Sequence, residues 1–236
     1  PTDQRDVLQP NVTVHRLAAR YDPPTRIRGL KWLYWRVASR MLQVANPMVW
    51  HWLRWDLASG EALARIDDQT PLDLVEAPEH AANGMVAGRM RRWPMVIRVH
   101  GPWDLFYGVN RTGGTTLNRL LAHLERASLD HADVVTTPTA AMSRFIARRW
   151  QLAQAPTVLP NFMDVPRRRP LLPGLDQPQR IICCGRIEPF KGQDVLARAF
   201  ARIAHEHPSA QLWLVGPDQW SGGFGQRLDR IVPDPA

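Results

Sequence analysis

Short apolar runs alternate with amphipathic stretches towards the carboxyl end of the chain. The run QRIICCGRI at Gln179–Ile187 is rich in apolar and β-branched residues and meets a Gly, which predicts a buried strand. Apolar residues recur at helical spacing across residues 192–208, and Pro208 predicts the end of that helix. The apolar run at Ala210–Asp218 predicts a second buried strand. This order predicts two parallel strands joined by a helical crossover.

The same α/β rhythm runs through the earlier part of the chain. Helical patterns occupy Thr116–Ala132 and Ala140–Trp150. Further short apolar runs predict strands at Asn11–Leu17, Leu72–Glu79, Pro94–Pro102, Ala132–Thr139 and Pro156–Asn161. Sites in open parallel sheets form beyond the carboxyl ends of the strands, so the residues that follow each strand are the first candidates for function.

A stretch rich in Pro and Arg separates the two α/β regions. Residues 164–179 have no hydrophobic period and are typical of a linker. The sequence therefore predicts a first domain at residues 1–163, a linker at 164–179 and a second domain at 180–236. The chain begins at Pro1 without a Met and ends soon after a predicted strand, so we expect a fragment.

The charge balance is strongly basic. The 236 residues carry a formal net charge of +8, and the sequence pI is about 10.6. Nucleic acid, an anionic membrane surface and a phosphorylated substrate all suit such a chain, and a solvated basic surface explains the total equally well. The basic residues are scattered and form no recognisable nucleic-acid motif, so we expect no nucleic-acid partner.

The cysteines and the apolar runs bear on the cellular compartment. Cys183 and Cys184 are neighbours on a predicted strand and point to opposite faces, which argues against a disulfide between them. We expect buried thiols in a reducing compartment. No apolar run reaches about 18 residues and no signal peptide is visible, so the predicted location is the cytoplasm.

Lysine is used sparingly, and one Lys stands in a notable place. Of 30 Lys and Arg residues, only Lys31 and Lys191 are Lys. The turn between the predicted strand at Gln179–Ile187 and the helix that follows it begins with Gly185 and Arg186. Four residues later come Lys191, a Gly and the helix. A helix N-terminus offers free N–H groups and partial positive charge, and Arg and Lys add donors suited to a diphosphate. The alternative is a surface Lys near a strand end.

Several stretches resemble one known family. The run GRIEPFKGQDVLARAFARIAHEHPSAQLWLVGP resembles the start of the C-terminal domain of family 4 glycosyltransferases. The stretches LDLVEAPEHAANG, VIRVHGP, ADVVTTPTAAMSRFIARRW and PTVLPNFMDV resemble the N-terminal domain of the same family. The resemblance covers nearly the whole chain downstream of about Val12. It implies an α/β fold of the GT-B type, with two Rossmann-like domains.

The resemblance implies a donor site in the second domain. Arg186 and Lys191 match the family's Arg and Lys that bind the donor pyrophosphate, and Gly192 lets the backbone approach closely. Gly185 and Gly216 match positions near the nucleotide. The implied substrate is a nucleoside diphosphate sugar, and the family's chemistry implies no metal or other cofactor.

The resemblance also implies roles for residues that follow two strands of the first domain. His100 matches a His near the donor sugar and the reaction centre, so it is the candidate catalytic residue; alone, it could equally be a structural His. Glu79 and His80 are candidates for contacts with acceptor or sugar hydroxyls, and a solvated loop is the alternative. Carboxylates beside a His also suit a metal, but the family implies none.

Two parts of the family pattern are missing. No Gly-rich turn precedes Asn11, and the chain stops before an acidic motif of the C-terminal domain. We therefore expect the first domain to lack its first strand, the second domain to be truncated, and this polypeptide alone to be inactive.

The tract Ile27–Trp55 combines Trp and Arg residues. This composition suits a peripheral contact with an anionic membrane at its inner face. It also suits helices packed on the sheet with Arg stems along their edges, and core packing is the favoured interpretation.

The expected function is that of a retaining glycosyltransferase that moves a hexose-like sugar to a hydroxyl of a saccharide or lipid-linked acceptor. Other interpretations remain open. They are a nucleotide-sugar epimerase of the same fold, a non-catalytic sugar-nucleotide binder and, with least support, a basic nucleic-acid-binding module.

Overall fold

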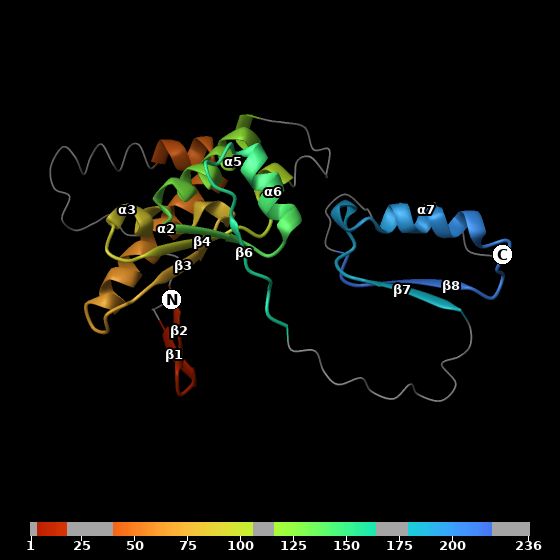
Figure 1. Ribbon diagram of the computed structural model, residues 1–236, viewed down its shortest axis with the longest axis horizontal. Helices are drawn as coiled ribbons and strands as arrows, with labels where there is room; N and C mark the ends of the chain where they lie inside the picture. Colours follow the sequence, from red (N-terminus) through yellow and green to blue (C-terminus); the bar gives the residue numbers. More distant parts are fainter. Residues whose placement is uncertain (1–3, 18–39, 106–115, 164–178, 219–236) are drawn as a thin grey trace. The chain divides into compact units, whose positions relative to one another are not determined.

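The computed structural model describes residues 4–17, 40–105, 116–163 and 179–218 (Figure 1). The chain divides into two compact units. Unit 1 comprises Pro1–Leu105 and Gly113–Phe162, and unit 2 comprises Phe106–Thr112 and Met163–Ala236. The predicted linker lies outside the described residues, apart from Gln179.

Unit 1 is built on a four-stranded parallel sheet. Its strands lie side by side in chain order: β3 (Val75–Pro78), β4 (Met95–Arg98), β5 (Val134–Thr137) and β6 (Thr157–Val158). Each strand falls inside one of the predicted apolar runs, so these strand predictions are confirmed. Because the strands are parallel, their carboxyl ends meet at one edge of the sheet.

One helix precedes β3, and three others connect the strands of this sheet. They are α2 (Pro47–Asp67), α3 (Met85–Met90), α5 (Thr116–Ser128) and α6 (Ala140–Arg149), with short 3-10 turns η1 (His80–Ala82) and η2 (Leu129–His131). The start of α2 is capped by the Asn46 side chain, which accepts the Val49 N–H at 3.2 Å, and Thr139 caps α6 in the same way. The helices predicted at Thr116–Ala132 and Ala140–Trp150 are confirmed.

The second half of α2 was not predicted from the sequence. Gly60 lies inside it and would ordinarily weaken a helix. A Cβ at this position would come within 2.7 Å of Val86 Cγ1 on α3. The glycine is therefore explained by the close packing of α2 and α3, which no local pattern reveals.

The hydrophobic core of unit 1 gathers along the buried face of its sheet. Met95, Ile97 and Val99 are almost fully buried along β4 and just beyond it. Ile146 of α6 and Leu129 of η2 belong to the same cluster. This core fixes the carboxyl ends of the strands, where the candidate residues of unit 1 lie.

Part of the Trp-rich tract packs into a second cluster. Val49 and Trp52 of α2 are buried with Ala81 and Leu121. Core packing is therefore confirmed for Val49 and Trp52, whereas Met41 and Val44 are exposed and residues 27–39 lie outside the described ranges. A contact of the tract with a membrane stays a prediction.

The start of the described chain forms a hairpin of two antiparallel strands, β1 (Gln4–Gln9) and β2 (Val12–Arg16). The strand predicted at Asn11–Leu17 is confirmed as β2. The strand β1 was not predicted, because its sequence QRDVLQ is mostly polar.

Unit 2 contains the predicted β-α-β order. Its parallel strands are β7 (Arg180–Cys184) and β8 (Gln211–Val215), joined through η3 (Pro189–Lys191) and α7 (Gln193–Ile203). The prediction that both strands are buried is wrong: Ile182, Trp213 and Val215 are about half exposed. Within the described residues, α7 packs on this sheet from one side, so alternate side chains of both strands are left in solvent. For the same reason Cys184 is exposed rather than buried.

Candidate functional site

Glu79, His80 and His100 all lie at the carboxyl edge of the unit 1 sheet. Glu79 and His80 follow β3, and His100 lies just beyond β4. The Glu79 side chain is almost completely buried, and its carboxylate accepts the N–H of His100 at 3.1 Å and of Gly101 at 2.7 Å. The structure therefore brings Glu79 and His100 together, with the His100 side chain exposed.

These contacts give Glu79 a clear local task. A carboxylate that accepts backbone N–H groups fixes a loop whose backbone groups have no partners in a sheet. Its described partners are backbone groups, so the geometry supports a positioning role. Contact of Glu79 with an acceptor or a sugar stays a prediction.

A second buried carboxylate, Glu125 of α5, lies in the same region. Its Oε2 accepts the Trp103 N–H at 2.6 Å, and its Oε1 lies 3.4 Å from the Ala81 nitrogen, which donates to it. The His80 Nδ1 is 3.9 Å from the same Oε1. Burial raises the pKa of Glu125 to about 8, and the nearby Glu79 carboxylate contributes to the rise.

Glu125 was not predicted from the sequence. It stands in the pattern LLAHLERAS, where a charged residue on a predicted helix is normally solvated. Its burial becomes visible only once the loops after β3 and β4 are folded over α5. A buried acid at an otherwise apolar helical position is the one pattern that could have raised the question.

Aromatic rings surround His80. The Trp52 ring centroid lies 5.5 Å from that of His80, and the Trp103 centroid lies 6.3 Å from it. The two indoles pack edge to face with centroids 5.8 Å apart. The His80 side chain is 58% exposed, so one part of the imidazole faces solvent and another part packs against the two indole rings.

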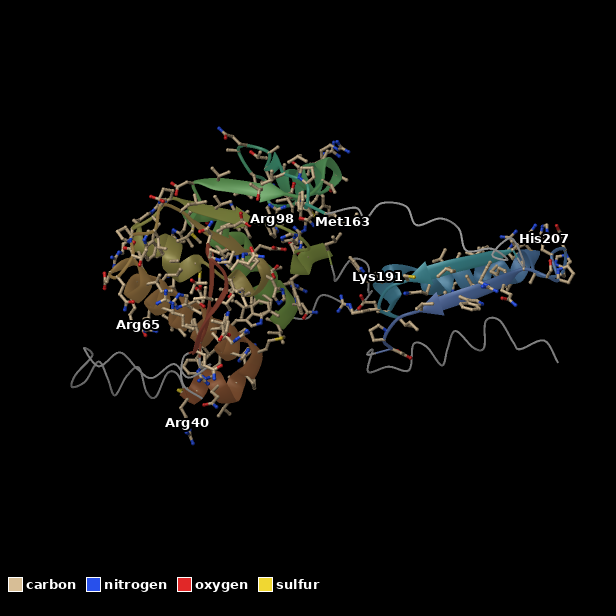
Figure 2. All side chains as sticks on the ribbon, turned by 90° about the horizontal axis from the view of Figure 1, so that it is seen from below. Arg40, Arg65, Arg98, Met163, Lys191 and His207 are labelled. Atoms are coloured by element: carbon tan, nitrogen blue, oxygen red, sulfur yellow. The ribbon has the colours of Figure 1, made fainter. Side chains whose placement is uncertain are left out.

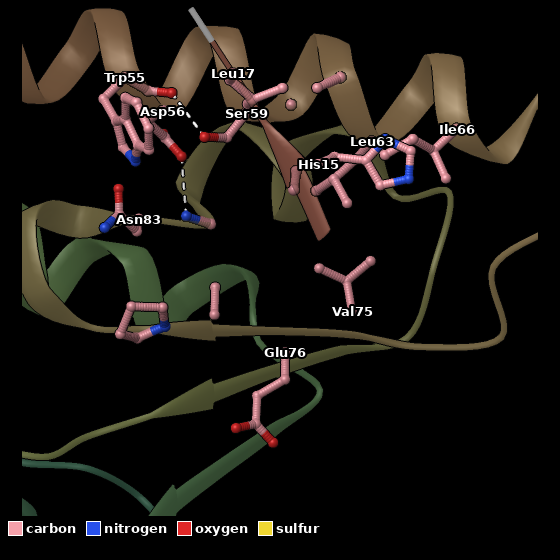
Figure 3. Close-up of a pocket in the computed structure, with 16 residues that line it drawn as sticks. His15, Leu17, Trp55, Asp56, Ser59, Leu63, Ile66, Val75, Glu76 and Asn83 are labelled. Atoms are coloured by element: carbon pink, nitrogen blue, oxygen red, sulfur yellow. Dashed lines mark hydrogen bonds between the residues drawn. The ribbon is translucent and has the colours of Figure 1, made fainter. Parts of the chain in front are cut away.

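A third acid holds the end of the same loop. Asp56 of α2 is buried and accepts the N–H groups of Gly84 and Val86, both at 2.9 Å. Figure 3 shows the first of these two bonds. Burial raises the pKa of Asp56 to about 6 against the opposing effect of these hydrogen bonds. Asp56, like Glu125, was missed from the sequence.

Asp56 also lines a cavity of about 390 Å³ between α2, β3 and the end of β2. Figure 3 shows Val75 directed towards α2 and Glu76 directed away from it. The walls are mainly apolar, and the buried Asn83 Oδ1 in them has no hydrogen-bond partner within the described residues. The cavity has the size of a small-ligand site, but it lies along β3 rather than at the loop that carries His100.

In unit 2, the predicted phosphate loop lies where the strands end. Figure 2 shows Lys191 at this end of the unit and His207 at the opposite end. Gly185 and Gly216 touch through their backbones: a Cβ on Gly216 would lie 1.9 Å from the Gly185 oxygen. The Gly185 N–H donates to the Val215 oxygen at 2.9 Å, which closes the ends of β7 and β8. The close approach requires a glycine at position 216, whereas a Cβ on Gly185 would meet no atom within 4 Å among the described residues. The proximity of both glycines to a nucleotide stays a prediction.

Arg186 and Lys191 are exposed cations on either side of this loop. Gly192 has a φ of 73° and precedes the first turn of α7, a helix of 11 residues. An Arg186 Nη lies 3.2 Å from Glu188 Oε1, and the Glu188 side chain is only 8% exposed. The loop therefore holds one of its two cations against a buried acid and leaves Lys191 in solvent.

Gln193 supports the loop from inside. It is 1% exposed, and its Nε2 donates to the Arg186 oxygen at 2.7 Å. Its Oε1 accepts the Glu188 N–H at 3.4 Å. Sequence reasoning missed Gln193 and Glu188, because neither has a charge or spacing that marks it as part of a phosphate loop.

Two further searches bear on the site. Among the described residues, no three His, Cys, Asp or Glu side chains gather in an arrangement that could hold a metal ion. In the same part of the chain, no helix is both long enough and apolar enough to cross a bilayer.

Comparison with known proteins gives one match. The family model described as Glycosyltransferase Family 4 matches residues 8–167, which is more than half of the chain. No curated protein matches the sequence significantly.

Proposed function

Because the chain belongs to glycosyltransferase family 4 and has the GT-B type of α/β fold, we propose that it acts in the transfer of a hexose-like sugar. The donor is a nucleoside diphosphate sugar, and the acceptor is a hydroxyl of a saccharide or a lipid-linked glycan. The reaction retains the anomeric configuration. The bond from the anomeric carbon to the diphosphate oxygen breaks, a bond to the acceptor oxygen forms on the same face, and the hydroxyl proton passes to the leaving diphosphate.

The loop after β7 is the observation that carries this proposal. It combines the N-terminus of α7, a bidentate donor in Arg186 and a mobile ammonium in Lys191. These groups stabilise the negative charge that builds on the leaving diphosphate. The contact with Glu188 leaves other N–H donors of Arg186 for a phosphate, because a guanidinium has five of them.

In unit 1, His100 is the proposed catalytic residue. Its imidazole is exposed beyond β4, and its backbone is fixed by Glu79. A neutral imidazole there can donate to a sugar hydroxyl or accept from one. The proposed reaction uses no metal, because Arg186, Lys191 and the helix terminus supply the positive charge.

Calorimetry with UDP, GDP and ADP tests the diphosphate site. Lys191→Ala should weaken binding of the preferred nucleotide by about 1.5–3 kcal/mol, the range for a charge-assisted hydrogen bond. The matched control is Arg202→Ala, which removes an exposed charge from the last turn of the same helix and should leave affinity unchanged. Unchanged affinity in Lys191→Ala would remove Lys191 from the site.

Product analysis tests the reaction itself. Because we expect this polypeptide alone to be inactive, a chain completed with the family's Gly-rich turn and acidic motif is incubated with labelled UDP-, GDP- and ADP-hexoses and a panel of saccharide and lipid-linked acceptors. We expect an α-linked product from an α-linked donor, with loss of turnover but not of nucleotide affinity in His100→Ala. Inverted product, an epimerised sugar nucleotide without transfer, or nucleotide binding alone would each reject the proposal.

A further inference from the structure

The loop that carries His80 holds an unfavourable backbone conformation. Ala81 and Ala82 have φ values of 59° and 54°, in the left-handed region where a Cβ costs about 1–2 kcal/mol per residue. Such strain persists only where surrounding contacts impose it, and it gathers at functional sites. The contacts that impose it here come from buried carboxylates on either side of the loop, Asp56 at Gly84 and Glu125 at Ala81.

Glu79 lies in one loop of the candidate site and holds the other, whereas Glu125 lies on α5 and holds both loops. One oxygen holds Ala81, next to His80, and the other holds Trp103, which follows His100 and Gly101. The chain beyond Trp103 is in turn fixed by Asp104, which accepts the Trp150 indole N–H at 2.7 Å. A change at Glu125 therefore reaches both loops at once.

We propose that Glu125 is a positioning residue that sets His80 and Trp103 in place for the acceptor, and that it does so with its carboxyl protonated. The role of the acceptor in this inference rests on the proposed sugar transfer. The contacts of Glu125 are those of the protein without ligands. In the neutral form, Oε2 still accepts the Trp103 N–H and Oε1 still faces the Ala81 N–H. His80 Nδ1 lies 3.9 Å from Oε1, which is beyond direct hydrogen-bond reach, so Glu125 places His80 through the backbone of the neighbouring Ala81.

The surroundings of Glu125 favour the protonated form of its carboxyl group. The titratable groups that face it are Glu79 and His80 from the loop after β3, and Asp104 from the segment after β4. The side of α2 that packs here contributes Val49 and Trp52, which do not titrate. With two neighbouring carboxylates and no solvent, the pKa of about 8 keeps Glu125 mostly neutral at pH 7.

Ionisation of Glu125 at higher pH places a charge between two other acids. Repulsion from Glu79 and Asp104 then acts on both loops. We therefore expect the affinity for the acceptor to fall as pH rises through about 8, with a smaller effect on nucleotide binding by unit 2.

The variant Glu125→Gln isolates the proton. Its amide oxygen can accept the Trp103 N–H, but its NH₂ cannot accept the Ala81 N–H, so the test compares how the two proteins depend on pH rather than their values at pH 7. Above pH 8 the wild-type kcat/KM for the acceptor should fall by about tenfold per pH unit, through KM, and that of Glu125→Gln should not. Asp130→Asn, which removes an exposed carboxyl just beyond α5, is the matched control and should follow the wild type.

An NMR titration decides the inference without an assay. In the wild type, the amides of Ala81 and Trp103 should shift together with a midpoint near pH 8, and this titration should vanish in Glu125→Gln. The Met95 amide, which donates to Asp133 at 2.7 Å, serves as the internal control. If the two amides titrate but no sugar transfer is found, the proposed function is rejected and Glu125 remains the positioning residue. If the amide shifts of a folded wild type do not change with pH, the positioning role itself is rejected.

Discussion

Gln151 holds a side chain where the backbone favours glycine. Its φ is 51°, it follows the last turn of α6, and the next N–H, that of Leu152, donates to the Ala147 oxygen at 3.1 Å. This is the position after a helix C-cap that usually carries Gly. Gln151→Gly should raise the free energy of unfolding by about 1 kcal/mol, because the left-handed strain is removed. Urea denaturation measures the gain, and Gln151→Ala, which keeps the strain, should show none.

Gly84 presents the opposite case. Its φ is 88°, and a Cβ there would lie 2.5 Å from Met95 Cε and 2.7 Å from Ala77 Cβ. Gly84→Ala therefore combines backbone strain with overpacking and should destabilise unit 1 by about 2–4 kcal/mol. Gly60→Ala, which has the packing clash without the left-handed φ, should cost less in the same denaturation experiment. Equal losses would show that the backbone at Gly84 carries no strain.

The residues that the sequence could predict and those it could not differ in a physical way. His100 and Glu79 follow apolar runs, so the position of the sheet edge was enough to group them. Asp56 and Glu125 lie in helices, where an acid is normally solvated, and an acid at an otherwise apolar position is at most a weak sign of burial. Only tertiary packing decides between them, because their partners are backbone N–H groups from loops 28 and 44 residues away.

At the scale of elements, Asp56 joins α2 to the start of α3. The burial that raises its pKa to about 6 means that the folded state binds the proton more tightly than the unfolded chain, whose value is near 3.8. The stabilisation is therefore complete below about pH 3.8 and is lost as pH rises through about 6. Relative to Asp56→Asn, which cannot titrate, the wild type should lose about 2–3 kcal/mol between pH 4 and pH 7.

Denaturation of both proteins across this range measures the difference, which cancels the carboxyl groups they share. Asp73→Asn, which removes an exposed carboxyl just before β3, is the matched control. A constant difference between the wild type and Asp56→Asn would mean that folding does not raise the pKa of Asp56 above its value of about 3.8 in the unfolded chain.

In unit 2, the hydrophobic pattern of the strands did not predict their burial. Both strands were predicted as buried from their apolar composition, but burial depends on what covers each face of the sheet. Packing by α7 covers the face that carries Leu212 and Leu214, and the opposite face carries Ile182 and Trp213. Arg180 lies over the Trp213 ring at 4.5 Å and shields part of that face. Strand position and direction followed from the sequence, whereas burial did not.

At the scale of the whole molecule, the two units differ in how much apolar surface they bury. In unit 1, β4 is flanked by strands on both sides, and Met95, Ile97 and Val99 are at most 1% exposed. In the described part of unit 2, the buried apolar side chains are Ala197 and Phe200. Local opening free energies follow buried contacts, so the two units should not open together.

Native-state hydrogen exchange should therefore separate the units. We expect amides of β4 and β5 to exchange at least about a hundredfold more slowly than those of β7 and β8, a difference of about 2.7 kcal/mol in opening free energy. The exposed hairpin β1–β2 serves as the fast-exchanging reference within the same chain. Saturating nucleotide should slow exchange in β7, β8 and α7 and leave β4 unchanged, because a ligand protects the unit to which it binds. Equal protection of β4 and β7 without nucleotide would mean that the chain unfolds as one cooperative body, and the stability of the donor loop would then depend on the core of unit 1.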